Sequence, residues 1–200
     1  MKKLIIPLFL MMASLTLVAQ EVFPHRDAVR IATYLNFDLS LFKNSPIPSD
    51  ADVKRAVGVR SGEYVGLIVP ECKLSAESFD NIGNKIIPVG QVWFHKITFL
   101  KDGEPTGLDK MQICPFTYRD TETKVALCLL GVKKKDNGDL ELLVYGKEKT
   151  PLIVLPLKKA ETKQEFPIEA DAEISGSYAT VTLKIVGKYQ ANFQVTEQNY

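Results

Sequence analysis

The sequence predicts an all-β protein: an antiparallel β-sandwich, immunoglobulin-like or jelly-roll-like, with a closed β-barrel as the alternative and one or two short helices. Three observations support this class. Apolar and polar residues alternate with a period of two over most of the chain after residue 19. Gly and Pro residues separate the candidate strands at intervals of about a dozen residues, as in sandwiches and barrels. Helix-capping signals are scarce, so helices are a minor component.

The first nineteen residues have the features of a secretory signal peptide. Two basic residues, Lys2 and Lys3, precede an apolar run over 4–18, and the small residue Ala19 follows. The run is shorter than the ~20 residues of a membrane-spanning helix. The leader and its junction resemble those of exported proteins of Gram-negative bacteria, and no Cys stands there to carry a lipid. We therefore expect export to the periplasm or the medium as an unlipidated, soluble protein.

Residues 20–200 are predicted to form a single β-sandwich domain, with two small β domains, 20–105 and 106–200, as the alternative. The formal net charge of +1 includes both leader lysines, so the exported chain would carry about −1 after two positive charges are removed. Charges of both signs are interspersed along the chain. This pattern gives no reason to expect nucleic acid or an anionic membrane as a partner.

Most strand candidates come from alternation alone. Ile31, Leu35, Phe37, Leu39 and Leu41 occupy alternate positions and predict a strand, and Trp93, Ile97 and Phe99 do so around His95. Further candidates cover the ranges 64–69, 111–118, 152–157 and 166–174. Two short helical turns are predicted, one over 52–56 after a Ser-Asp cap at 49–50 and one over 77–82 after a Ser cap at 75.

Asn137-Gly138 is the strongest hairpin signal, because this residue pair tolerates the positive φ angles of a type I′ turn. Apolar runs stand on both sides of it between residues 124 and 147. A two-residue turn would pair Val132 with Leu143 and Leu130 with Tyr145, which gathers apolar side chains on one face. The flanking sequence therefore predicts a solvated hairpin tip that is structural.

The last hairpin, over 177–196, is predicted to turn around Gly187. A two-residue turn would oppose apolar and polar side chains. A loop with an odd number of residues instead gathers the apolar side chains on one face, with three predicted pairs: Ile185 with Ala191, Leu183 with Phe193, and Val181 with Val195. The odd loop is favoured because a one-residue slip would exchange the two faces of the strand.

Three cysteines follow the leader: Cys72, Cys114 and Cys128. Cys114 and Cys128 are equidistant from Thr121, which lies in a polar stretch that can form a turn. A hairpin centred there would set these two residues on neighbouring strands and allow a disulfide in an oxidising compartment. The alternative is that all three are small, buried, apolar residues.

No pattern of residues predicts a catalytic, metal or cofactor site. The chain has two histidines, His25 and His95, and His95 shares its parity with residues expected to be buried, so a structural imidazole is favoured. Ser61 lacks the glycine spacing of a nucleophile elbow. The Asp50/Asp52 pair and the Asp136–Asp139 loop lack the ligand run of a calcium loop, so they are interpreted as a cap and a turn.

The sequence therefore favours an exported, non-catalytic binding module that recognises a protein or glycan partner. The alternative is a lipocalin-like carrier of a small apolar ligand, with a cavity lined by residues such as Trp93 and Phe116. A third hypothesis is a thiol-dependent hydrolase, which would need a thiol such as that of Cys72 within hydrogen-bond reach of His95. The sequence indicates neither the partner nor the oligomeric state.

Overall fold

The computed structural model describes residues 21, 22, 24–39, 45–80, 82–118 and 120–199. The predicted leader lies outside these residues, and so does Leu41. The elements follow one another in this order: β1 (Glu21–Val22), α1 (His25–Leu39), η1 (Val53–Arg55), β2 (Val57–Ser61), β3 (Tyr64–Pro70), η2 (Ala76–Phe79), β4 (Ile87–His95), β5 (Ile97–Lys101), β6 (Glu104–Pro105), η3 (Leu108–Lys110), β7 (Gln112–Tyr118), β8 (Thr121–Lys134), β9 (Leu140–Tyr145), β10 (Ile153–Lys159), β11 (Ile168–Ser175), β12 (Tyr178–Ile185) and β13 (Tyr189–Glu197).

The strands form one antiparallel sheet in the order β1-β2-β3-β4-β8-β9-β10-β13-β12-β11. Two long strands, β8 and β13, each pair with three other strands, so the sheet branches at them. One edge of β8 pairs with β4, while its other edge pairs first with β7 and then with β9. In the same way, β13 pairs with β12 on one edge and with β10 and β5 on the other. Strands from both halves of the chain are therefore neighbours in the sheet.

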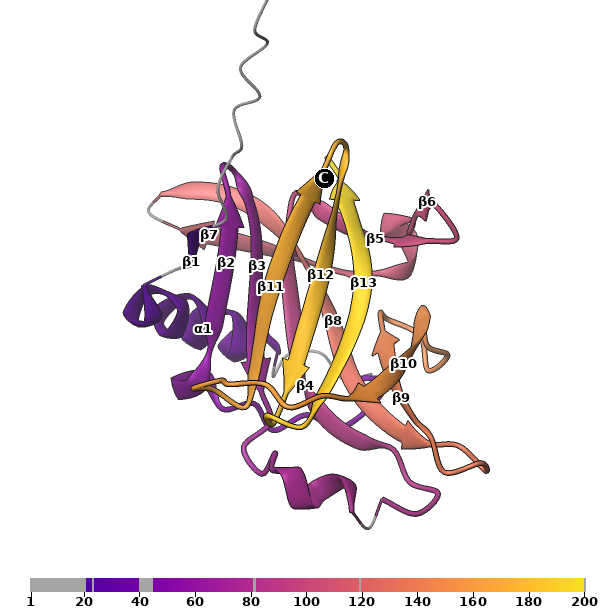
Figure 1. Ribbon diagram of the computed structural model, residues 1–200. Helices are drawn as coiled ribbons and strands as arrows, with labels where there is room; N and C mark the ends of the chain where they lie inside the picture. Colours follow the sequence, from indigo (N-terminus) through magenta and orange to yellow (C-terminus); the bar gives the residue numbers. More distant parts are fainter. Residues whose placement is uncertain (1–20, 23, 40–44, 81, 119, 200) are drawn as a thin grey trace, which may run out of the picture.

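The sheet curls into a half-barrel, which confirms the all-β prediction. Its two arms, β2–β4 and β11–β13, face each other across an apolar core, and β11 approaches β2 and β3. Figure 1 shows β11–β13 in front of β4 and β8, with α1 to one side. A second apolar cluster lies on the opposite face of β3, β4 and β8, where α1 packs. The same strands thus separate two cores.

The predicted strand around Ile31 is wrong, because residues 25–39 form helix α1. Ala28, Ala32 and Leu35 are spaced by four and three residues, so they share one helix face, and they are 0%, 0% and 2% exposed. Pro24 precedes the first helical residue, where its missing N–H is not needed. The strand prediction counted the larger apolar residues at alternate positions and left out Ala28 and Ala32, which complete the helical spacing.

The predicted strand through His95 is two strands instead of one. Lys96 has φ = +58°, which ends β4 at His95 and starts β5 at Ile97. The parity of Trp93 does not continue across this bend. Trp93 belongs to the cluster against α1, whereas Phe99 belongs to the core between the arms.

The hairpin at Asn137-Gly138 is confirmed, but its turn type and register differ from the prediction. Gly138 has φ = +92°, Asn137 does not have positive φ, and the Lys135 N–H donates to Asp139 O over 2.8 Å. These features define a three-residue loop in which the glycine follows an ordinary turn. Each partner therefore shifts by one residue, and Val132 pairs with Leu142.

The odd loop of the last hairpin is confirmed, and it covers residues 186–188. It is two residues shorter than predicted, so each partner shifts by two and the apolar faces stay together. The observed pairs are Ile185 with Tyr189, Leu183 with Ala191, and Val181 with Phe193.

The remaining predicted elements lie close to observed ones. Strands β3, β7, β10 and β11 match the four ranges predicted from alternation to within two residues at each end. The two predicted helical turns are the short 3-10 helices η1 and η2. Asp52 caps η1 instead of the predicted Ser49-Asp50, with its carboxylate accepting from the Lys54 N–H over 3.1 Å. Ser75 is the N-cap of η2, as predicted.

Candidate functional site

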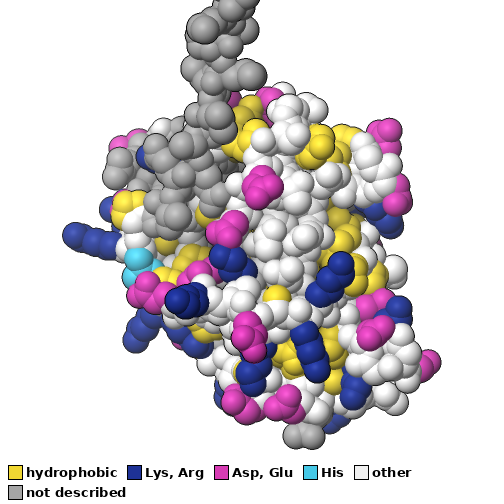
Figure 2. All heavy atoms as spheres, viewed as in Figure 1, with side chains coloured by type: hydrophobic (Ala, Val, Ile, Leu, Met, Phe, Trp, Pro, Cys, Tyr) yellow, Lys and Arg dark blue, Asp and Glu magenta, His cyan; other side chains and the backbone are white. Residues whose placement is uncertain are grey.

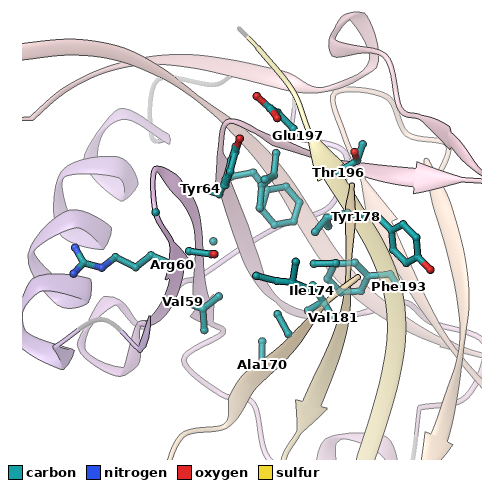
Figure 3. Close-up of a pocket in the computed structure, with 18 of the residues that line it drawn as sticks. Val59, Arg60, Tyr64, Ala170, Ile174, Tyr178, Val181, Phe193, Thr196 and Glu197 are labelled. Atoms are coloured by element: carbon teal, nitrogen blue, oxygen red, sulfur yellow. The ribbon is translucent and has the colours of Figure 1, made fainter. Parts of the chain in front are cut away.

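An apolar cavity of about 460 Å³ lies between the two arms of the sheet. Its walls are the inward faces of β2–β5 on one side and of β11–β13 on the other. Figure 3 shows Val59 facing Ala170, Ile174 and Val181 across the space. The cavity extends from a buried end near Ile68 to an exposed mouth beside the β2–β3 and β11–β12 turns.

Small side chains account for the empty space. Gly66 on β3, Ala170 and Ala172 on β11, and Ala179 on β12 all line the cavity. For a Cβ atom added to Gly66, the nearest atoms would be Val59 Cγ2 at 3.5 Å and the Phe94 ring at 3.8 Å, which are ordinary van der Waals contacts. Most of the other buried side chains of this core are Val, Leu, Ile or Phe. The opposing walls therefore cannot fill the space between them.

Three aromatic rings form the rigid part of the wall. Phe94 and Phe193 line the cavity, and Phe99 lies between them with ring centroids 4.9 Å from Phe94 and 5.0 Å from Phe193. Phe99 is fully buried. Offset and edge-on ring packing of this kind adds to the stability gained from burial alone. The cluster therefore keeps the cavity wall in place without a ligand.

The mouth combines exposed apolar and polar side chains. Ile174 and Tyr178 are 49% and 37% exposed and both line it. The Tyr64 hydroxyl donates a hydrogen bond to the Glu197 carboxylate, which raises the pKa of Tyr64 above its usual value. Glu63, also at the mouth, forms an ion pair with Lys96, and this partner lowers the pKa of Glu63.

The cavity lining predicted from the sequence is wrong. Trp93 is buried on the opposite face of β4, where its Nε1–H donates to Gln91 Oε1 over 3.0 Å. Phe116 packs against the same cluster as Trp93. The neighbour of Trp93, Phe94, lines the cavity instead. A usable signal was present on β11, where alanines at 170 and 172 replace bulky residues in the inward row between Ile168 and Ile174.

His95 and Cys72 are not brought together. His95 belongs to one end pair of the β3–β4 ladder, with Val65, and Cys72 lies two residues beyond the other end pair, Pro70 with Gly90. The ladder spans about 17 Å. His95 Nδ1 is 3.1 Å from Lys124 O and 3.3 Å from Thr123 Oγ1. Burial and the nearby carboxylates of Asp50 and Asp52 raise the pKa of the Cys72 thiol, which disfavours the nucleophilic thiolate. This geometry gives no support to the hydrolase hypothesis.

The Cys114–Cys128 disulfide that the sequence allowed is not formed. Their strands, β7 and β8, are neighbours as predicted, but the turn lies between Tyr118 and Thr121, so Cys114 pairs with Val125. The two cysteines are also on opposite faces of the sheet and belong to different clusters. Burial raises the pKa of Cys128 to about 12.

A polar network connects the segment around Ser49 to the face of β3 and β4 that packs against α1, here called the filled face. Glu71, only 7% exposed, accepts hydrogen bonds from Ser49 Oγ and the Asp50 N–H, both over 2.5 Å. Gln91, fully buried, donates to Ser49 Oγ over 3.1 Å and to Asn36 Oδ1 on α1 over 3.4 Å. Burial raises the pKa of Glu71. Each polar side chain has a partner here, so the network is interpreted as structural.

The acidic residues considered as metal ligands have other partners. Asp52 binds the Arg55 side chain over 2.6 Å, and the Asp139 carboxylate accepts from the Asn137 amide over 2.7 Å inside the hairpin turn. Within the described ranges, no three His, Cys, Asp or Glu side chains are grouped as a metal site would require. Ser61 is the last residue of β2, and His25 stacks on Phe166.

Two further observations concern partners. On the face shown in Figure 2, acidic and basic side chains are interspersed. No helix in the described part of the chain has the length and apolar character needed to cross a bilayer. Comparison with known proteins gives no matching family model, no similar curated protein and no similar solved structure.

Proposed function

We propose that this protein is a carrier or binding protein for a small, largely apolar ligand held between the two arms of the half-barrel. The observation that supports this proposal is the apolar cavity with its exposed mouth. Its volume of about 460 Å³ lies within the range of ligand pockets, roughly 300–1,000 Å³. Empty apolar space of this size costs stability, so its presence needs a functional reason.

Recognition of a protein or glycan partner, which the sequence favours first, remains a prediction. Two of the large apolar side chains that a protein could contact, Ile174 and Tyr178, lie at the cavity mouth. Entry of an apolar ligand accounts for their exposure without a second partner. Export and release from the cell also remain predictions, because residues 1–19 lie outside the described part of the chain.

The proposal is tested by titrating the protein with N-phenyl-1-naphthylamine, a neutral apolar probe whose fluorescence rises in apolar surroundings. We expect saturable binding of one probe per chain. Ala172→Phe places a ring in the cavity, because Ala172 lies on the inward face of β11, and should weaken binding at least tenfold. Ala179→Leu provides a second filling variant from the neighbouring strand.

The matched control is Glu173→Phe, which adds the same ring to the exposed outward face of β11 and should bind the probe as the parent does. Circular dichroism and thermal unfolding establish that each variant is folded. Absence of saturable binding by the parent would contradict the proposal. Equal affinities for the parent and both folded filling variants would place the probe elsewhere and would also contradict it.

A further inference from the structure

The mouth of the cavity carries a polar pair that faces inward. Tyr64 on β3 has the same strand parity as Gly66 and Ile68, and Glu197 on β13 has the parity of Phe193 and Val195. The tyrosine hydroxyl donates to the Glu197 carboxylate, so the pair bridges two strands at the entrance. Figure 3 shows both side chains at the same end of the space, with their oxygen atoms at its rim.

The charges around this pair leave the entrance negative. Glu63 is neutralised by its ion pair with Lys96, which stands between β4 and β5. The guanidinium group of Arg60 points away from the cavity, toward α1 (Figure 3). The partner that Tyr64 provides to Glu197 is a neutral hydroxyl, which does not cancel a charge. Among the residues that the structure describes, no Lys or Arg is recorded in an ion pair with Glu197, so its carboxylate contributes negative charge on the inward face of the mouth.

Thr196, which also lines the mouth, is engaged in holding the β11–β12 turn. Thr196 Oγ1 donates to the Ser177 carbonyl over 2.8 Å. Ile97, which is paired with Glu197 in the β5–β13 ladder, adds an apolar side chain to the lining. A ligand that enters tail first would thus place its polar end beside a hydrogen-bond acceptor with a negative charge, above an apolar interior.

We infer that the ligand is an amphiphile whose apolar tail lies against Phe94 and Phe193 in the cavity and whose polar end is a hydrogen-bond donor, an amine or an alcohol, placed beside Glu197. This inference rests on the proposed function. A carboxylate end, as in a fatty acid, would face the like charge of Glu197 and is disfavoured. Because Glu197 is exposed, the discrimination is moderate.

The test uses three probes with the same twelve-carbon tail: dodecylamine, 1-dodecanol and dodecanoate. Each is titrated at low salt and neutral pH as a competitor of N-phenyl-1-naphthylamine bound to the full chain. We expect the amine to bind about tenfold more tightly than the carboxylate, with the alcohol between them, as a charge near water-exposed Glu197 would give. Added salt should reduce the difference between amine and carboxylate and leave the alcohol unaffected.

Glu197→Gln removes the negative charge at the mouth without changing the packing of the side chain. It keeps the size of the side chain and an oxygen that accepts from Tyr64, and it should bring amine and carboxylate to within about twofold of each other. Glu173→Gln makes the same change on the outer face of β11 and should leave the ratio as in the parent. If no probe binds, the proposed function itself fails. If the probes bind but the carboxylate equals or exceeds the amine, only this inference is overturned.

Discussion

The two faces of strands β3 and β4 meet opposite surroundings. On one face, Leu67 and Trp93 are 2% exposed and pack under α1 in a filled cluster. On the other face, Gly66 and Phe94 border a cavity of about 460 Å³. Adjacent residues of one strand thus lie in a close-packed core and beside empty space. The difference shows that the same strands pack into a filled core under α1 and leave space between the arms.

The largest expected effect comes from truncating neighbouring residues on the two faces. Trp93→Ala should lower the free energy of unfolding by about 4–5 kcal/mol, and Phe94→Ala by about 2–3 kcal/mol. Trp93 is enclosed and holds Gln91 by a hydrogen bond, whereas part of the Phe94 ring already lacks neighbours. Urea unfolding of both variants measures the difference. An equal or greater loss for Phe94→Ala would show that the cavity does not weaken the packing of its wall.

Two glycines on the same side of the sheet sharpen the comparison. A Cβ atom at Gly90, at the filled end of the core, would lie 2.5 Å from Val69 O, whereas one at Gly66 would have no contact shorter than 3.5 Å. Gly90→Ala should therefore destabilise by about 1–3 kcal/mol. Gly66→Ala should be neutral or stabilise by up to about 1 kcal/mol, because it reduces the freedom of the unfolded chain. Thermal unfolding tests both, and a clear loss of stability in Gly66→Ala would contradict open space at that position.

The sequence predicted some local elements of this fold and missed others. The hairpin at Asn137-Gly138 and the odd loop near Gly187 depend on contacts between neighbouring strands and on turn residues, so alternation and turn chemistry predicted them. The register at Asn137-Gly138 was missed because β8 and β9 are apolar on both faces, so a one-residue slip leaves the pattern nearly unchanged. The register near Gly187 was missed because loops of three and of five residues keep the same faces together. Helix α1 was missed because its buried face begins with the small residues Ala28 and Ala32.

The candidate site could not be predicted from patterns within single segments of the sequence. Its walls come from β2–β5 and β11–β13, which are distant in sequence and meet only when the sheet curls. Alternation correctly indicated two faces for the segment at Trp93, but it could not show which face was filled. That outcome depends on the alanines at 170 and 172, which face the cavity from the other arm. Cavity volume is a property of opposing surfaces and not of one strand.

The smallest expected effect is a pH dependence on the filled face. Burial raises the pKa of Glu71, so its contribution to stability is full below the ordinary value of 4.5 and is lost as the pH rises through the raised value. The advantage of the parent over Glu71→Gln should therefore shrink as the pH rises above the ordinary value of 4.5. Urea unfolding at increasing pH measures it, with Glu173→Gln as an exposed control. A constant or growing advantage would contradict burial of an ionisable carboxyl in this network.

The central claim is that the hollow face of the sheet, and not the filled one, receives an apolar ligand. The most direct test is an isotope-filtered nuclear Overhauser measurement between unlabelled 1-dodecanol and methyl-labelled protein. We expect contacts from the alkyl chain to the methyl groups of Ile68, Val92 and Val181, which line the cavity, and none to Leu67 or Leu127 on the opposite face. Contacts to Leu67 and Leu127, or only to exposed methyl groups such as those of Val154, would contradict the account.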